Sequence, residues 1–365
     1  MSAQLFAFGC ALSLAAGCRI GFDSEPALSD STARFKLEFD NTASDTDLVD
    51  FPVAVFLDSS RIDFAEIEAN GQDILFLDAD ETTALPHEIE MWNDGDASLI
   101  WVKVPTIDAN SETDHFWLYV GGGGPGTQRP TEVWAPDYRA VWHFADDPSD
   151  GRIDDSTEFD HDAVISGAMT ASDRVPGGLG YAIEFDGVDD AALVGDPSDG
   201  SLDFGTDSFG FAAWIRVDPS GGEFDVPVDK GGSSTSRTGY NMELGTGDWA
   251  PGLADGAAVY GPSFGEEGLY LGRTVYLATV HDGADSELRA YADGLAVGAE
   301  PTPSLQSTSS DIPLVIAATA DAENFLPGQI AELRIRNGSV TGDWVGAQQR
   351  STRDTFISYG QREPL

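Results

Sequence analysis

The amino-acid sequence predicts an all-β protein made of two β-sandwich domains. Its 365 residues are enough for about two domains, each with a core of its own. The 41 glycines and 19 prolines accompany 41% hydrophobic residues, a balance typical of turn-rich β structure and not of disorder. Short apolar runs recur between Asp, Asn, Pro and Gly, and many of them alternate with the period of two that marks a strand.

The formal net charge of −44 limits the kinds of partner that the chain can have. A surface of this charge repels nucleic acid and anionic lipid headgroups, so we expect no nucleic-acid partner. The cations are mainly arginines, because Lys36, Lys103 and Lys230 are the only lysines in the sequence. Acidic, lysine-poor surfaces suit high salt, where counterions screen the self-repulsion.

The first eighteen residues contain no charged side chain and are apolar from Leu5 to Gly17. This run is too short to cross a membrane as a helix, but it fits the apolar region of a signal peptide. It ends in the letters LAAGC, which resemble the bacterial lipoprotein box. The resemblance implies that residues 1–18 are a lipoprotein signal peptide. The chain would be cleaved before Cys18, and Cys18 would be lipidated as the new N-terminus. Two alternatives for these residues remain open, a plain signal peptide without lipidation and a slightly hydrophobic disordered tail.

The cysteine count agrees with a lipoprotein. Cys10 and Cys18 are the only cysteines, so the processed chain would carry one cysteine, at its first position. The polar, proline-containing residues 19–33 would form a tether. We therefore expect an exported protein at the outer membrane or cell surface, in contact with the membrane only through its lipid anchor.

The first predicted domain covers residues 34–124. Its apolar runs are spaced as in a β-sandwich and read RFKLEFDN, LVDFPVAVFLD, DILFLDAD, HEIEMWND, LIWVKVP and HFWLYVG. Their order resembles an uncharacterised bacterial extracytoplasmic domain (the domain of unknown function 2341 type) that often precedes laminin-G-like modules. The resemblance implies an architecture and no chemistry. A linker at 125–132 is expected to follow.

The letters HEIE at residues 87–90 look like part of a zinc-protease motif, but Met91 stands where that motif needs its second histidine. We expect a strand here, with Ile89 pointing inward and the two carboxylates outward. The five histidines of the chain are scattered, and none has a Cys or His at ligand spacing.

The second predicted domain covers residues 133–361 and centres on residues 181–217. Asp186 and Gly187 provide the chemistry of a tight turn between two strands. In the last run of this stretch, one face of a strand is apolar through Phe209, Phe211, Ala213, Ile215 and Val217.

The letters FDGVDD followed by AAWI resemble the bacterial laminin-G-like, concanavalin A-like jelly roll. Later turns at Asp282–Gly283 and Asp293–Gly294 fit the same family. Near the end of the chain, residues 341–343 are expected to start a short helix that runs through Gln349. Residues 357–360 would then return to the sheet of this domain.

Catalytic members of the fold, the retaining glucanases, carry paired carboxylates in a Glu-x-Asp-x-Glu type of spacing that this sequence lacks. Glu184, Asp186 and Asp189 come nearest, but they cross the predicted turn. The letters GPSFG at residues 261–265 match the serine-hydrolase elbow in form, yet Pro262 lies inside them and no helix start follows. We therefore expect no enzyme activity.

Calcium is the cofactor that the fold family suggests, because many such jelly rolls hold one structural ion. Asp186, Asp189 and Asp190 could contribute ligands, although they could equally serve only the turn. The family pattern has an aspartate before Glu332, and here Ala331 stands in its place. A structural calcium is therefore left open, and no metal ligand is assigned.

A glycan site would need aromatic rings exposed on a sheet face. Trp214 has the opposite parity to the apolar Phe209–Ile215 set, and Tyr291 has the same relation to its own strand. Tyr240 and Trp249 lie in glycine-rich segments that are expected to be loops. These four residues are the predicted ligand-binding residues. In the alternative, loops cover Trp214 and form a second small core.

Three functions remain open at this stage. The first is a non-catalytic envelope lipoprotein whose laminin-G-like module binds a glycan or an envelope protein. The second is a glycoside hydrolase or polysaccharide lyase on the same jelly roll. The third is a structural or adhesive envelope component without a small ligand.

Overall fold

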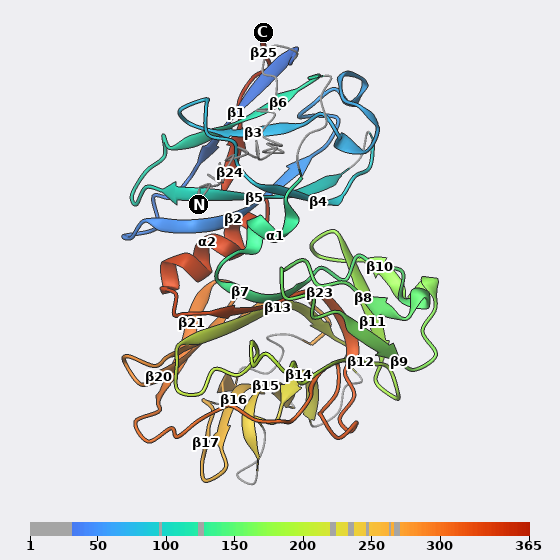
Figure 1. Cartoon of the computed structure of the whole chain (residues 1–365), viewed down its shortest axis with the longest axis vertical. Coiled ribbons are helices and arrows are strands. Elements are labelled where there is room, and N and C mark those ends of the chain that lie inside the picture. Colours follow the sequence, from blue (N-terminus) through green and yellow to red (C-terminus); the bar gives the residue numbers. More distant parts are fainter. Residues whose placement is uncertain are drawn as a thin grey trace, which may run out of the picture.

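The structure is a computed structural model, and it describes residues 31–94, 97–122, 128–219, 224–232, 237–245, 248–262, 264–265 and 271–365. The described chain forms two lobes built mainly of strands, so the predicted all-β class is confirmed (Figure 1). Helices α1 (Pro130–Trp134) and α2 (Gly342–Thr352) lie between the lobes. None of the described helices combines the length and the apolar character that crossing a bilayer requires.

The first lobe is a sandwich of two antiparallel sheets. Alternating burial along β1 (Ala33–Phe39) places Phe35, Leu37 and Phe39 in the core between the two sheets. Among the described residues, short 3-10 turns occur at Phe64–Glu66, Ala69–Gly71, Pro148–Asp150 and Ala171–Asp173. The strands of the first sheet are β24 (Ile357–Tyr359), β1 (Ala33–Phe39), β6 (His115–Val120), β3 (Leu75–Asp78) and β25 (Glu363–Pro364); those of the second are β2 (Leu48–Leu57), β5 (Ser98–Ile107) and β4 (His87–Met91).

The last strands of the chain belong to the first lobe, which corrects the predicted return of residues 357–360 to the second domain. β24 pairs with β1 through Leu37 and Tyr359, and β25 extends the same edge. Phe356 explains the placement, because its ring is fully buried against Phe39 and Phe51 of the first core. The predicted end of the second domain at residue 361 is therefore wrong, and the C-terminal segment ties the two lobes together.

The second lobe is a jelly roll of two sheets around the largest core of the described chain. We call the sheet that lies against the first lobe the docked sheet, and the other one the free sheet. The docked sheet contains β10 (Arg174–Pro176), β11 (Tyr181–Asp186), β23 (Pro327–Asn337), β13 (Phe209–Val217), β19 (Val275–Asp282), β20 (Glu287–Ala292), β21 (Leu295–Pro301) and β7 (Tyr138–Trp142).

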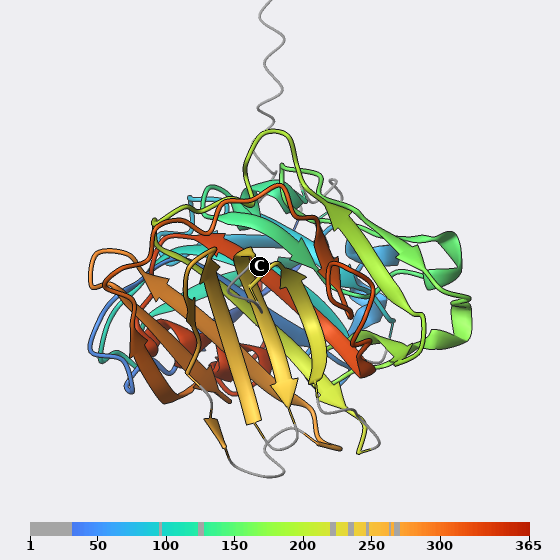
Figure 2. The same ribbon diagram turned by 90° about the horizontal axis from the view of Figure 1, so that it is seen from below.

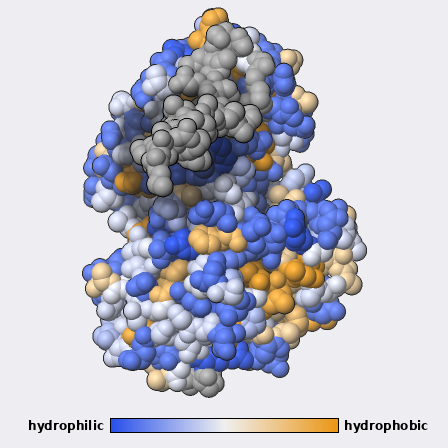
Figure 3. All heavy atoms as spheres, viewed as in Figure 1, coloured by the Kyte–Doolittle hydropathy of each residue, from blue (hydrophilic) through white to orange (hydrophobic). Residues whose placement is uncertain are grey.

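The long central strands of the free sheet, which are the yellow arrows of Figure 2, lie at the end of the molecule far from the first lobe. Its strands are β17 (Val259–Tyr260), β16 (Asp248–Asp255), β15 (Thr238–Gly245), β14 (Phe224–Lys230), β22 (Leu314–Ile316), β12 (Ala191–Gly195), β9 (Ala163–Ser166), β8 (Arg152–Ile153) and β18 (Phe264–Gly265). Hydrophilic residues predominate on the molecular face shown in Figure 3, in keeping with the net charge of −44.

The lobes meet through the outer faces of two sheets, the docked sheet and β2–β5–β4, with both helices at the contact. Trp101 of β5, Trp134 of α1 and Trp214 of β13 are buried in one hydrophobic cluster there.

The predicted start of α2 is confirmed, since the Thr341 side chain accepts a hydrogen bond from the Trp344 N–H and caps the helix. Its Ser351 hydroxyl in turn accepts a 2.8 Å hydrogen bond from the backbone N–H of Ala54.

Candidate functional site

The predicted ligand-binding residues Trp214 and Tyr291 lie on the outer face of the docked sheet, where their parity placed them, but they do not reach solvent. Their exposed fractions are 1% and 4%. The first lobe and α2 cover this face, so Trp214 packs against Tyr276 and beneath Arg353. Their prediction as sugar-stacking residues is wrong, because the first lobe, and not a set of loops, covers this face of the sheet.

Tyr240 and Trp249 lie on strands β15 and β16 and not in loops, and both are fully buried. They belong to the core between the two jelly-roll sheets, where Tyr240 packs against Phe209 and Phe211. The glycines around them sit within strands that run close together, which the composition of the segment did not reveal. Their prediction as ligand-binding residues is also wrong.

The lobe contact contains a cluster of buried charged residues, which we call the interface cluster: Glu88, Glu90, His143, Glu332 and Arg334. Glu88 and Glu90 lie on β4 of the first lobe, His143 follows β7, and the other two lie on β23. The strand alternation at residues 87–90 is as predicted, with Ile89 against the first core and the carboxylates on the opposite side. The expectation that these carboxylates face outward to water is wrong, because the second lobe covers them.

His143 lies at the centre of the interface cluster. Its Nδ1 is 2.8 Å from a carboxylate oxygen of Glu332 and 3.4 Å from one of Glu90, and its Nε2 is 3.4 Å from Glu88. Arg334 donates from Nε to the other oxygen of Glu332 at 2.6 Å. Its guanidinium also lies 4.1 Å above the ring of Trp101. Cations and carboxylates therefore alternate through the cluster.

Indole and hydroxyl groups supply the remaining donors to the two β4 carboxylates. Trp134 Nε1 and Ser156 Oγ each donate to Glu88 at 2.6 Å. Trp101 Nε1 donates to Glu90 at 2.7 Å, while the second oxygen of Glu90 has no partner among the described residues. Glu88 thus accepts strong hydrogen bonds on both oxygens and Glu90 on only one.

This difference shifts the two pKa values in opposite directions. Burial raises the pKa of Glu90 to about 8, and neighbouring Glu332 adds to the effect. Burial also acts on Glu88, but the charge of His143 and the donated hydrogen bonds outweigh it and lower its pKa. Burial alone would lower the pKa of His143, yet the carboxylates of Glu332, Glu90 and Glu88 raise it well above its usual value. With Glu90 protonated and His143 charged, the five residues sum to zero charge.

In the part of the chain that the structure describes, two groups of side chains have a geometry that could hold a cation: Glu90 with His143 and Glu332, and Asp186 with Asp189 and Asp190. In the first group, protons and the Arg334 guanidinium already balance the carboxylates. In the second, Asp186 accepts from the backbone of the turn and Asp190 accepts from the Asp186 N–H. These bonds are what a turn needs without an ion. Ala331, at the position where the family pattern has an aspartate, is buried in the lobe contact.

The outer face of the free sheet carries a second polar group. Asp229 is fully buried and accepts hydrogen bonds from the backbone N–H groups of Gly231, Gly232 and Ala320, which fixes two loops beside the sheet. Next to it on β15, Asn241 is 1% exposed, and its carbonyl oxygen has no partner among the described residues.

Glycine allows the backbone to pack closely around this amide. A Cβ at Gly252, which is opposite Asn241 in the register, would lie 2.2 Å from the amide oxygen. Glu243 follows on the same face, where burial raises its pKa. Arg237 completes the group, with its guanidinium 3.8 Å from Asp229 and paired with Asp321. Donors and acceptors therefore lie together on a face that the first lobe does not cover.

Two other sequence features fall outside the residues that the structure describes. Cys18, the predicted lipidation site, is one of them. Ser263, the central residue of GPSFG, is the other.

Two family models match the chain in the predicted order. Residues 70–160 match a family described as a domain of unknown function (DUF2341), and residues 186–346 match the concanavalin A-like lectin/glucanases superfamily. The first match continues past the first lobe into β7 and β8, so it includes Glu88, Glu90 and His143 from both sides of the lobe contact. No curated protein matches the sequence.

Solved structures similar to this chain include the binding domain of Paraclostridial Mosquitocidal Protein 1, at 12% identity and a TM-score of 0.47, with 59% of this chain and 52% of that one covered. The receptor binding domain of botulinum neurotoxin C/D mosaic serotype matches at 10% identity and a TM-score of 0.45, covering 58% and 51%. The binding domain of Botulinum Neurotoxin DC in complex with SialylT matches at 9% and 0.46, covering 60% and 52%. The alignments span about half of each of those chains. From the family matches, the chain contains a domain of unknown function 2341 segment followed by a concanavalin A-like domain of the lectin/glucanase superfamily.

Proposed function

We propose that the chain is an exported, lipid-anchored envelope protein whose concanavalin A-like domain binds a glycan, without catalysis, on the outer face of the free sheet. The observation that carries the proposal is the buried, unpartnered carbonyl oxygen of Asn241 on the jelly-roll face that the first lobe leaves uncovered. A buried polar atom without a partner costs free energy, and a ligand hydroxyl would relieve that cost.

The chemistry around Asn241 supports a hydroxyl-rich ligand. The amide offers both a donor and an acceptor, Glu243 offers acceptors, and Arg237 offers donors, which together can bind the hydroxyl groups of a sugar ring. Gly232 and Gly252 allow the backbone to pack closely around Asn241, because a Cβ at either position would collide with Asn241. A protein ligand is the alternative, and an envelope component without any ligand is the third possibility.

The position of the two lobes supports an anchored role. The predicted tether, residues 19–33, leads into β1 of the first lobe, and the free sheet lies at the opposite end of the molecule (Figure 1). A lipid on Cys18 would therefore leave the free sheet pointing away from the membrane, with the first lobe as a base between them.

The test is a glycan-array screen of the purified chain, run with calcium and with a chelator, beside the variants Asn241→Ala and Glu243→Gln. Asn93→Ala and Glu112→Gln are matched controls, since both residues are exposed on the first lobe. Binding that is lost in the free-sheet variants and kept in the controls would support the site. Binding that survives Asn241→Ala would place the site elsewhere, and a blank array for the unmodified chain would refute the glycan ligand in favour of a protein ligand or a structural role.

One observation favours an enzyme as the second candidate. A hollow of about 370 Å³ at the lobe contact is lined by Glu88, Glu90 and His143. Carboxylates whose pKa values are pushed apart are typical of acid–base pairs. The side chains of Glu88 and Glu90 are only 11% and 1% exposed, however, which limits access for a substrate. Release of reducing ends from polysaccharides, abolished by Glu88→Gln, would establish the enzyme; no release would refute it.

A further inference from the structure

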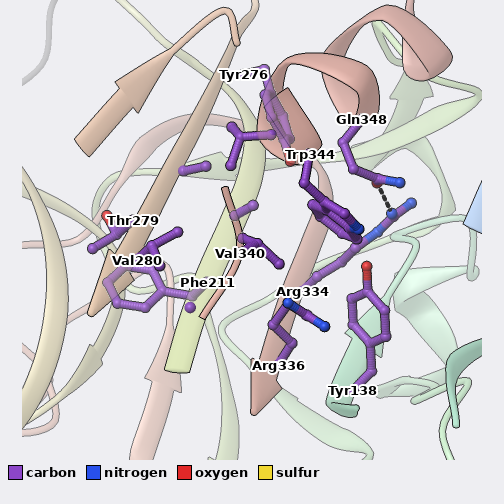
Figure 4. A pocket seen from close by; sticks show the side chains of 14 residues that line it. Tyr138, Phe211, Tyr276, Thr279, Val280, Arg334, Arg336, Val340, Trp344 and Gln348 are labelled. Atoms are coloured by element: carbon purple, nitrogen blue, oxygen red, sulfur yellow. Dashed lines mark hydrogen bonds between the residues drawn. The ribbon is translucent and has the colours of Figure 1, made fainter. Parts of the chain in front are cut away.

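We propose that the cavity between the docked sheet and α2 binds a small inorganic anion of the size of chloride, held by Tyr138, Arg334 and Arg336. The cavity has a volume of about 30 Å³ and lies within the lobe contact. Figure 4 shows these three side chains with Trp344 and Gln348 around it. A space of this size admits one or two atoms as large as a water molecule and no polyatomic ligand such as phosphate.

The register of the docked sheet explains why the cavity exists. β23 places Arg336 opposite Gly210 and Arg334 opposite Ala212 of β13. On the other side of β13, Ala212 is paired with Ala278 of β19. The centre of the sheet therefore has almost no side-chain volume beneath the two guanidinium groups, while Trp344 and Val345 of α2 close the space from above.

The polar atoms at this cavity lack an acceptor. Tyr138 OH, Arg334 Nη2, and both Nε and Nη1 of Arg336 are buried without a hydrogen-bond partner among the described residues. Burial raises the pKa of Tyr138, and the charge of Arg334 and its contact with the hydroxyl act in the opposite direction, but that contact does not reach the geometry of a normal hydrogen bond. Thr279 Oγ1, which also lines the cavity, is likewise buried without a partner, so five such atoms lie at one cavity, more than chance packing leaves unpaired in a native protein.

The existing partners of these side chains do not supply the missing acceptor. Arg334 already donates to Glu332 and to Gln348 from its other nitrogens, and Gln348 spends its own amide N–H on the carbonyl of Pro52. Arg336 uses its remaining nitrogen on Asp137. No carboxylate is among the described residues that line the cavity. The three remaining guanidinium nitrogens therefore lack an acceptor among the described residues.

The chemistry of these donors favours an anion over water. A guanidinium has no acceptor atom, so a water beside Arg334 and Arg336 could receive hydrogen bonds from both but could give its own hydrogens only to hydroxyl oxygens of the lining, those of Tyr138 and Thr279. A halide accepts from all of these donors and has no hydrogen to place. Hydrogen bonds from a charged donor to an anion are also the stronger kind.

The cavity borders an open cleft on the side of Arg336. This cleft, of about 510 Å³, is lined by Arg336, Val340 and Trp344, and the same three residues line the cavity. Aspartates also line the cleft, so an anion that enters from this side passes them before it meets the Arg336 guanidinium. Because α2 forms one wall of the cavity and packs on β2 of the first lobe, the anion would stabilise the contact between the lobes.

Two measurements on the purified chain test the proposal. Crystals grown in sodium bromide should give an anomalous difference peak between Tyr138 and the two guanidinium groups. In solution, the midpoint of thermal unfolding should be several degrees higher in sodium chloride than in sodium gluconate at equal ionic strength, because gluconate is too large for the cavity.

The variants Tyr138→Phe and Arg336→Met should lose most of this difference. Tyr138→Phe removes one oxygen and keeps the packed ring, so it should remain folded even where the arginine variant does not. Arg289→Met is the matched control, since Arg289 pairs with carboxylates and lines the neighbouring cleft but not the cavity. Water without bromide in the cavity would overturn the proposal. A chloride effect that is the same in Tyr138→Phe as in the unmodified chain would overturn it as well.

Discussion

The variant Glu90→Gln should make the protein more stable, even though it replaces a residue at the centre of the buried interface cluster. Burial raises the pKa of Glu90 to about 8, so at neutral pH this side chain is a neutral carboxylic acid in the folded protein. Glutamine has nearly the same shape and is also neutral. Its carbonyl oxygen can accept from Trp101, as the Glu90 oxygen does at 2.7 Å.

The gain arises in the unfolded state. There Glu90 regains its usual pKa of 4.5 and loses its proton, which favours unfolding of the unmodified protein as the pH rises from 4.5 to about 8. Because the pKa is raised on folding, the stabilising contribution of the protonated acid is complete below 4.5 and is lost as the pH rises through 8. Glutamine has no such loss. At 1.36 kcal/mol per pH unit, the variant should exceed the unmodified chain by about 1 kcal/mol at pH 5, about 3 kcal/mol at pH 7 and about 5 kcal/mol at pH 9.

Urea unfolding at these three pH values, followed by tryptophan fluorescence, measures the difference. Glu112→Gln is the control, because Glu112 is exposed and its replacement should have a small effect that does not change with pH. The signature of the mechanism is the increase of the gap with pH. A Glu90→Gln variant that is less stable than the unmodified chain, or a gap that stays constant from pH 5 to pH 9, would show that Glu90 is ionised in the folded protein and would refute the charge assignment of the cluster.

Three further predictions concern stability. Trp214→Ala should cost about 3–5 kcal/mol, because the indole is 1% exposed and its removal leaves a void between the lobes; urea unfolding measures the loss. Asp229→Asn should cost about 1–3 kcal/mol by weakening three charge-assisted hydrogen bonds from backbone N–H groups, and faster hydrogen exchange at Gly231, Gly232 and Ala320 should accompany it. Phe356→Ala should destabilise the first lobe by about 3–5 kcal/mol, although it follows the second lobe in the chain, and hydrogen exchange of β1 should report the change.

Outside the glycine-rich segments of Tyr240 and Trp249, which were expected to be loops, local sequence pattern predicted strands and the orientation of side chains within them. The alternation at residues 87–90 and at 209–217 assigned each side chain to the correct side of its strand, since that assignment depends only on the period of two. The same holds for α2, whose cap at Thr341 is a local signal. What covers each outer face is decided by contacts between segments far apart in the sequence, and no local pattern encodes it.

This limit explains the incorrect predictions at the lobe contact. Trp214 and the two β4 glutamates were each assigned correctly to an outer face; the glutamates were expected to meet water, and Trp214 to meet either water or covering loops. The structure places the two faces against each other. The return of residues 357–359 to the first lobe was missed for the same reason, because strand pairing with β1 depends on Phe356 reaching a core that begins more than three hundred residues earlier.

The lobe contact has the composition of a protein interior. Large indole rings pack there around a cluster whose charges cancel only when residues from both lobes are present, since Glu88 and Glu90 come from β4 while His143, Glu332 and Arg334 come from the jelly roll. Separating the lobes would expose Trp214 and the interface cluster to water. It would also break either the pairing of β24 with β1 or the packing of the segment that connects β24 to β23 of the second lobe. The family segment at residues 70–160 also crosses this contact, so it does not coincide with the first lobe. The first lobe is thus an integral cover of the docked sheet, and for this reason the glycan site that we propose is on the free sheet.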